Sequence, residues 1–231
     1  MMLIVDNNMD ISGYPQGLMV CLALGAAGLS AKIKKPTELT EEDYETDKVI
    51  LCGSTSYIRE NKKWMKNEQL CISEWMQRKT PILGICFGGQ LLAQHIFGDV
   101  ITAMPVPVSG SVMFRRRKAP LFDGLPERFG VVTSHYEAFS VPDKHIIGEI
   151  DEWPSYAFFY PPNIWGLQFH PELMGFAGRG IVRLQRMVYD RHVYQDFSVR
   201  TQGGHGKRML RNFTEHAPIR ARLQVPSVAP Q

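Results

Sequence analysis

The sequence lacks the marks of several large classes of protein. None of its apolar stretches approaches the roughly 20 residues that a helix needs to cross a bilayer. It begins MMLIVD, without a basic region or a cleavage site, so we expect no signal peptide. The excess of 26 basic over 23 acidic residues is too small to indicate a nucleic-acid surface. We therefore expect neither a membrane nor a nucleic acid among its partners.

Cysteine is also sparse, and its spacing excludes the usual zinc sites. The four cysteines, at positions 21, 52, 71 and 86, form no C-x-x-C pair and no zinc-like arrangement. We expect no metal ion and no other cofactor, and we expect reduced thiols in a cytoplasmic protein. The composition, 44% hydrophobic and 21% charged, is that of an ordinary globular protein, and 231 residues favour one domain over two.

Short β-rich runs alternate with helical stretches in the part of the chain before Gly98. This alternation predicts an α/β fold with a mostly parallel central sheet and flanking helices. The expected strands are residues 3–5, 31–34, 49–52 and 81–85. Three helices are expected in this part of the chain. The first covers residues 16–27 and is capped by Gly28, and the last covers residues 91–97. The middle helix has a buried face that carries Trp64, Cys71, Ile72, Trp75 and Met76.

The pattern changes after Gly98. Short strand candidates between Pro, Gly and Asp turns predict a smaller, more antiparallel region, at residues 106–114, 130–133, 145–150, 156–160 and 165–169. Two helices are expected near residues 178–192 and 207–216. The last residues, 217–231, are rich in proline and poor in large apolar groups. We therefore expect a single domain of residues 1–216 followed by a flexible tail.

The segment at residues 84–90, GICFGGQ, carries the strongest functional signal. It lies between a buried strand and the next helix, in the pattern of a nucleophile elbow with Cys86 as nucleophile. Glycines two residues to either side allow so sharp a turn without Cβ clashes. The helix N-terminus favours the thiolate, and the amide of Phe87 can donate to an oxyanion. We interpret Cys21, Cys52 and Cys71 as structural, because each lies in an apolar pattern.

A second segment, residues 166–172 with the sequence GLQFHPE, supplies the remaining groups. A nucleophilic thiol needs a base and a general acid, and His170 can serve as both near neutral pH. Glu172 can fix the tautomer of the imidazole and stabilise its charged form. Pro171 stiffens the turn between them. The sequence therefore predicts a Cys-His-Glu catalytic triad.

These two segments resemble the motifs of class I, triad-type glutamine amidotransferases, whose triad would here be Cys86, His170 and Glu172. Further similarity to this family, and to its GMP-synthase-like stand-alone members, is found at residues 3–10, 120–126, 133–137 and 209–213. The resemblance covers about residues 3–214. It implies a three-layer, flavodoxin-like fold with a mostly parallel central sheet.

The resemblance also implies a mechanism. The Cys86 thiolate would attack the side-chain amide of glutamine, His170 would protonate the leaving ammonia, and water would then hydrolyse the γ-glutamyl thioester. Two backbone amides would hold the oxyanion, and further groups would hold the amino-acid end of the substrate. The residues expected to contact substrate are Gly53, Ser54, Phe87, Gln90, His135, Tyr136 and Glu137. The ammonia would pass to a synthetase site on another domain or subunit.

Two features depart from the family pattern. The strand that supplies one oxyanion donor usually ends in a GGPG-like loop, whereas residues 52–56 here read CGSTS. The backbone amide is retained, but the sequence leaves the orientation of that peptide open. In addition, residues 173–206 separate the HPE segment from the closing helix by more than is usual in the family. We expect these residues to form an insert, either a surface decoration or a docking site.

Several functions are compatible with these motifs. No synthetase motif is found, so we expect glutamine as substrate and, as partner, a separate ammonia-accepting synthetase. A hydrolase of other γ-glutamyl compounds would use the same thiol chemistry. A non-catalytic regulatory homologue is a third possibility, against which the intact triad argues. The basic run at residues 115–118 either contacts an acidic partner or forms a solvated face.

Overall fold

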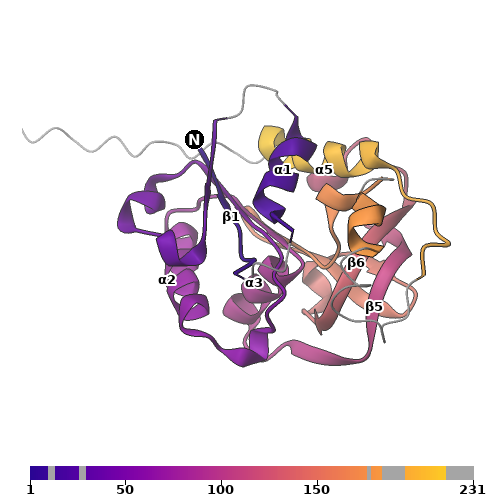
Figure 1. Cartoon of the computed structure of the whole chain (residues 1–231), viewed down its shortest axis with the longest axis horizontal. Coiled ribbons are helices and arrows are strands. Elements are labelled where there is room, and N and C mark those ends of the chain that lie inside the picture. The colour runs from indigo at the N-terminus through magenta and orange to yellow at the C-terminus, as the bar shows by residue number, and fades with distance from the viewer. Residues whose placement is uncertain (10–13, 26–29, 176–177, 184–195, 217–231) are drawn as a thin grey trace, which may run out of the picture.

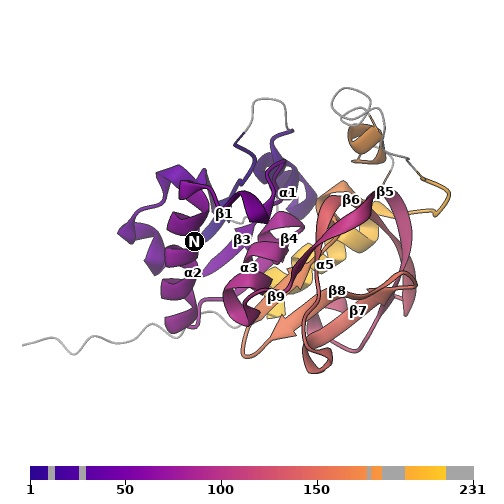
Figure 2. The same ribbon diagram turned by 90° about the horizontal axis from the view of Figure 1, so that it is seen from below.

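The described strands form one sheet of mixed direction. The computed structural model describes residues 1–9, 14–25, 30–175, 178–183 and 196–216. Within these residues a nine-stranded sheet has the order β2-β1-β3-β4-β9-β8-β7-β5-β6. Helices cover both of its faces (Figures 1 and 2). The predicted α/β architecture of a large sheet with flanking helices is therefore confirmed.

One half of the sheet is parallel. It contains β1 (Met2–Val5), β2 (Ala31–Lys34), β3 (Lys48–Leu51), β4 (Ile82–Ile85) and β9 (Ile164–Leu167). β1 pairs with β2 and β3, β3 pairs with β4, and β4 pairs with β9. Every residue of β1, β3, β4 and β9 is buried, which accounts for their almost wholly apolar sequences.

The other half is antiparallel, as the turn-rich sequence predicts. It contains β5 (Ile101–Arg116), β6 (Arg128–Phe139), β7 (Ile146–Ile150) and β8 (Trp153–Tyr160). β8 pairs antiparallel with β9, so β9 joins the two halves. β5 and β6 are much longer than predicted. The two strands pair with each other along most of their length, with one irregularity between Ala103 and Val108. This pairing keeps residues in strand conformation whose own sequence pattern does not predict a strand.

Alternate residues of the parallel strands face two separate helical layers. Ile4 and Ile50 lie in a cluster with α1 (Gln16–Leu24) and α5 (Gly203–His216). Leu3 and Val49 lie in a second cluster with α2 (Lys63–Gln77) and α3 (Phe87–Phe97). The two pairs of helices lie on opposite faces of the sheet (Figure 1). The period of two along each strand thus produces the three layers.

Two predicted helices need correction. The first helix ends at Leu24 and is followed by Gly25 with a φ of 77°, so the predicted end at residue 27 was too late. The predicted cap, residue 28, lies outside the described residues. On α2 the buried face includes Glu68, whereas the predicted Trp64 and Met76 are only partly buried at its edges. The apolar pattern alone could not identify a buried carboxyl group.

The region after the HPE segment is only partly described. Residues 178–183 are helical, but residues 184–195 of the predicted helix and the predicted tail at 217–231 lie outside the described residues. The closing helix begins at Gly203, earlier than predicted, and two of its glycines, Gly203 and Gly206, lie close to the preceding turn. A Cβ added to Gly206 would lie 2.0 Å from the carbonyl oxygen of Pro171. In the described parts of the chain, no helix has the length and apolar character needed to span a membrane.

Candidate active site

Cys86 occupies a strained turn between β4 and α3. Its backbone φ is 51° and its ψ is −109°, an unusual conformation for a residue with a side chain. The flanking glycines permit the close crossing of chain segments that this turn requires. A Cβ on Gly84 would lie 2.5 Å from the carbonyl oxygen of Gly88, and one on Gly88 would lie 2.3 Å from that of Leu51. Only glycine fits at these two positions.

The thiol of Cys86 lies at the N-terminus of α3. Its Sγ is 3.8 Å from the carbonyl oxygen of Ser134 and 4.0 Å from Nε2 of Gln168. Phe87 is the first residue of α3, so its amide has no acceptor within the helix. Among the described residues this amide donates to no other acceptor. The thiol therefore lies beside a backbone donor that is available to a bound molecule.

His170 and Glu172 form a buried pair directly after β9. Their side chains are held by the short turn Pro171–Leu173, and His170 Nδ1 lies 2.8 Å from Glu172 Oε1. The His170 amide donates to the carbonyl oxygen of Val132 on β6, at 2.8 Å, which ties the turn to the antiparallel half of the sheet. The sequence-predicted pairing of the two side chains is thus present in the structure.

The pKa of His170 reflects these surroundings. Burial alone would lower the pKa of the imidazole, but the carboxylate of Glu172 and the thiolate of Cys86 outweigh burial and raise that pKa to about 10. A cation on His170 and anions on its two neighbours stabilise one another. The imidazolium form of His170 is therefore favoured near neutral pH.

Tyr14 is a contact of this pair that the sequence analysis did not identify. Its hydroxyl lies 3.4 Å from both His170 Nδ1 and Glu172 Oε1. Burial and the negative charge of Glu172 raise the pKa of the phenol well above its usual value, so it remains a donor. Tyr14 lies 156 residues before His170 in the chain, and no local motif connects the two.

A cavity of ≈ 260 Å³ brings the predicted residues together. It is lined by Cys86, His170 and six of the seven predicted substrate contacts, except Gly53. Gly53 lies just beside it, since a Cβ there would be 3.1 Å from His170 Cε1. Glu172 lies behind His170 and outside the lining. The lining residues that the sequence analysis missed are Tyr14, Gln16, Thr55, Ser56, Tyr57, Ser134, Leu173 and Val182.

One end of the cavity is built from groups that bond to one another. Gln90 Nε2 donates to the carbonyl oxygen of Glu137 at 2.5 Å. The Glu137 carboxylate accepts from the amide of Ile58 at 2.7 Å and lies 3.5 Å from Nε of Arg59. Burial raises the pKa of this carboxyl group. His135 is also held, because its Nε2 lies 2.9 Å from the Tyr156 hydroxyl. This end is polar, and its side chains are held by hydrogen bonds.

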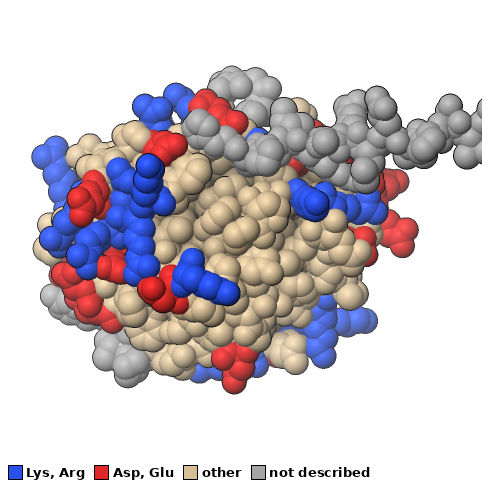
Figure 3. Space-filling view, turned by 180° about the vertical axis from the view of Figure 1, so that it is seen from behind, with Lys and Arg blue, Asp and Glu red and all other residues tan. Residues whose placement is uncertain are grey.

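The basic run at residues 115–118 is largely occupied within the protein. Arg115 and Arg117 both pair with Glu149, and Arg117 also pairs with Asp143. Arg116 donates to the carbonyl oxygen of Leu125. On the face in Figure 3, Lys and Arg side chains lie among Asp and Glu and form no continuous basic surface. These contacts support the interpretation of the run as a solvated face. Among the described residues, no group of His, Cys, Asp and Glu is arranged to hold a metal ion.

The chain is similar to enzymes that use glutamine. GMP synthase [glutamine-hydrolyzing] of Streptococcus pyogenes serotype M5 (strain Manfredo) is 28% identical over 148 residues, which are 62% of this chain and 26% of that protein. The chain thus matches about a quarter of the length of the curated relatives.

Solved structures show the same fold. A glutamine amido transferase from Methylobacillus Flagellatus has a TM-score of 0.75 at 17% identity, covering 94% of this chain and 95% of that one. A glutamine amidotransferase from Thermotoga maritima has a TM-score of 0.71 at 22% identity, covering 94% and 97%. The family model described as glutamine amidotransferase class-I matches residues 17–180. The chain therefore belongs to the class I glutamine amidotransferase family.

Proposed function

We propose that the chain hydrolyses the side-chain amide of glutamine through a γ-glutamyl thioester on Cys86. The observation that carries this proposal is the cavity in which the strained Cys86 elbow faces His170, itself paired with Glu172 at 2.8 Å. In a chain of this family, that arrangement supplies a nucleophile, a general acid and base, and an orienting carboxylate.

Acylation begins with the thiolate. The sulfur of Cys86 attacks the carboxamide carbon, and the carbonyl electrons move onto oxygen to form a tetrahedral oxyanion. Collapse of that intermediate breaks the C–N bond, and the leaving nitrogen takes a proton from the His170 imidazolium. The raised pKa of His170, about 10, means that this proton is present at neutral pH. Ammonia and a thioester result.

Deacylation uses the same groups in reverse roles. Neutral His170 accepts a proton from water, the hydroxide attacks the thioester carbonyl, and the thiolate leaves as glutamate forms. Glu172 holds Nδ1 of His170 throughout, so that the other ring nitrogen faces the reacting atoms. The amides of Phe87 and of Gly53 or Ser54 are the proposed donors to the oxyanion in both steps.

The polar end of the cavity is the proposed site for the amino-acid end of glutamine. It contains Gln90 and the segment His135, Tyr136 and Glu137, held together by the bond between Gln90 Nε2 and the Glu137 carbonyl. A buried carboxylate there suits an ammonium group. We further propose that the ammonia is delivered to a separate synthetase subunit. The matched relatives are named GMP synthases, and the matched part is about a quarter of their length.

Covalent labelling tests the nucleophile. A diazo-oxo amino acid that mimics glutamine should add once per chain, and peptide mapping by mass spectrometry should place the adduct on Cys86. Excess glutamine should slow the labelling, and the Cys86→Ser variant should not be labelled. Cys21 is the matched competitor because it is more exposed than the other three cysteines. An adduct on Cys21, Cys52 or Cys71 would show that the proposed nucleophile is wrong.

Turnover separates glutamine hydrolysis from the alternative activity on γ-glutamyl compounds. We expect the wild-type chain to release glutamate from glutamine faster than from γ-glutamyl amides of larger amines, and Cys86→Ser to release it from neither. Assays with and without a candidate synthetase measure how far a partner raises the rate. A wild-type chain that reacts with the larger amides alone would favour the γ-glutamyl hydrolase.

A further inference from the structure

The peptide between Cys52 and Gly53 is held at its carbonyl oxygen by two donors. Its carbonyl oxygen accepts the amide of Gly88 at 3.2 Å and Nδ2 of Asn7 at 3.1 Å. A trans peptide is planar, so its N–H points away from its C=O. Two donors that fix the Cys52 carbonyl therefore also fix the direction of the Gly53 N–H.

The Gly53 amide is available to a bound molecule. Among the described residues it donates to no acceptor, and Gly53 lies close to His170 at the edge of the cavity. We propose that Asn7 and Glu68 are positioning residues, which aim the Gly53 N–H at the oxyanion that forms when the Cys86 thiolate attacks its substrate. This inference rests on the proposed function.

Asn7 fixes both sides of the turn. Besides its side-chain bond to Cys52, its main-chain carbonyl accepts the hydroxyl of Ser54 at 2.7 Å. The same Ser54 oxygen accepts the amide of Ser56 at 3.1 Å. Asn7 is fully buried, so water does not compete for these bonds. The turn CGSTS lacks the usual glycine-rich sequence, and these side-chain bonds supply the order that its own sequence does not.

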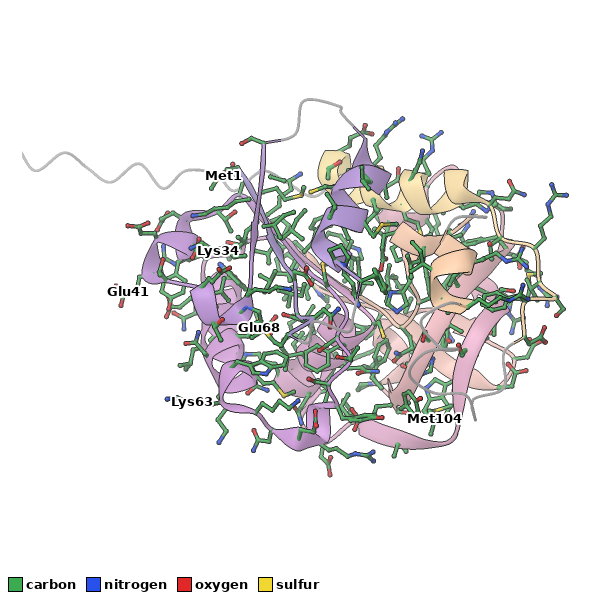
Figure 4. The ribbon with its side chains drawn as sticks, viewed as in Figure 1. Met1, Lys34, Glu41, Lys63, Glu68 and Met104 are labelled. Atoms are coloured by element: carbon green, nitrogen blue, oxygen red, sulfur yellow. The ribbon has the colours of Figure 1, made fainter. Side chains whose placement is uncertain are left out.

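Glu68 fixes the orientation of the Asn7 amide. Its Oε1 accepts from Nδ2 of Asn7 at 3.0 Å, the nitrogen that also donates to Cys52. With both N–H groups engaged, the amide plane cannot rotate without losing a bond. Glu68 is fully buried and extends from α2 towards the sheet, whereas Lys63 on the same helix extends outwards (Figure 4). Burial raises the pKa of Glu68 to about 8, so it is a neutral acid at pH 7.

The principal test compares two buried asparagines. Asn212 also donates its side-chain N–H groups to two carbonyl oxygens, at 3.0 and 2.9 Å, but it belongs to α5. We expect Asn7→Leu to lower kcat for glutamine by about 10²–10³-fold with KM within severalfold, because the oxyanion forms only after substrate binds. Asn212→Leu should lose comparable stability in urea unfolding but keep the wild-type kcat.

Alkylation of Cys86 by iodoacetamide separates aiming from general disorder. That reaction displaces iodide from carbon and forms no oxyanion, so its rate should be unchanged in Asn7→Leu. Glu68→Leu should lower kcat by about tenfold, the equivalent of one hydrogen bond. Glu68→Gln, which keeps a neutral acceptor, should restore kcat to within a few-fold of wild type. If Asn7→Leu does not fold, the comparison of kcat between Glu68→Leu and Glu68→Gln tests the inference instead.

Three outcomes overturn the inference while leaving the proposed function intact. They are a folded Asn7→Leu with wild-type kcat, an equal loss of kcat and of alkylation rate, and an equal loss of kcat in Asn212→Leu. The proposed function itself fails differently. In that case the wild-type chain neither hydrolyses glutamine nor forms an adduct of glutamyl mass on Cys86. The inference about Asn7 and Glu68 then fails together with the proposed function.

Discussion

The buried pair of His170 and Glu172 is the residue-scale feature with the clearest electrostatic consequence. Burial disfavours the imidazolium, and the charges of Glu172 and Cys86 reverse that preference. The protonated imidazole exists only because its anionic neighbours are buried with it and are correctly placed. The pair therefore depends on the charge of Glu172 more than on its shape.

Replacing that charge should shift the pH dependence of glutamine hydrolysis. In wild type the raised pKa keeps His170 protonated up to about pH 10. In Glu172→Gln the pKa of His170 falls, so the protonated acid is lost at lower pH, and the alkaline limb of kcat/KM should move to lower pH. His170→Ala should cost more, on the order of 10²–10⁴-fold in rate.

Tyr14→Phe is the control for this prediction. It removes the hydroxyl that lies 3.4 Å from Glu172 Oε1 but keeps the carboxylate, so it should shift the profile less than Glu172→Gln. The measurement is kcat/KM for glutamine between pH 6 and about 10 for all three variants. If the alkaline limb of kcat/KM is unshifted in a folded Glu172→Gln, the charge of Glu172 is not what raises the pKa of His170.

At the scale of elements, α5 supports the turn that carries the candidate acid and base. Its glycine-rich first turn, which the sequence analysis placed in the insert before the closing helix, packs on the backbone of Pro171 and Met174. Gly206 makes the closest approach, and Gly204 in the same helix has no atom within 4 Å of its potential Cβ. The two glycines therefore form a matched pair of test positions.

Gly206→Ala should disturb the site, whereas Gly204→Ala should not. A Cβ at position 206 would lie 2.0 Å from the Pro171 carbonyl oxygen, so the turn must move and kcat for glutamine should fall at least tenfold. Gly204→Ala should keep the wild-type kcat and gain up to about 1 kcal/mol of stability, because alanine favours a helix. Kinetics and urea unfolding check both. Equal kcat in the two variants would show that α5 does not position the triad.

At the scale of the whole molecule, the candidate site lies at the carboxyl ends of neighbouring parallel strands. Asn7 follows β1, Gly53 follows β3, Cys86 follows β4 and His170 follows β9. This is where open α/β sheets place their ligands. Segments up to 163 residues apart, from position 7 to position 170, meet there because the strands are adjacent in the sheet.

Global stability should depend on pH through Glu68. Its pKa is about 8 in the folded protein against 4.5 for a free carboxyl group, so the folded state holds this proton more tightly. Its stabilising contribution is full below pH 4.5 and is lost as the pH rises towards 8, at about 1.4 kcal/mol per pH unit. The neighbouring thiols of Cys52 and Cys71 have pKa values raised by burial and stay neutral over this range.

Glu68→Gln should remove that dependence. We expect the difference in unfolding free energy between wild type and Glu68→Gln to change by a few kcal/mol from pH 5 to 8, with the variant gaining relative to wild type. Glu74→Gln is the control, because Glu74 lies on the same helix but is half-exposed and paired with Arg78. Urea titrations at several pH values measure all three proteins. If the unfolding free energies of wild type and Glu68→Gln change with pH in parallel, Glu68 is not a neutral acid in the folded protein.

The sequence by itself determined the features that are encoded locally. The apolar runs of the parallel strands, the glycines around Cys86 and the adjacent His170 and Glu172 each lie within a few residues, so their patterns predict the elbow and the pair. The tertiary structure decided the rest. The contacts of Asn7 with Cys52 and Glu68 join residues 45 and 61 positions apart, and Tyr14 reaches the His170 pair over a still longer separation. Such contacts depend on which strands and helices become neighbours, which no local pattern encodes, and the same is true of the extra length that pairing gives β5 and β6.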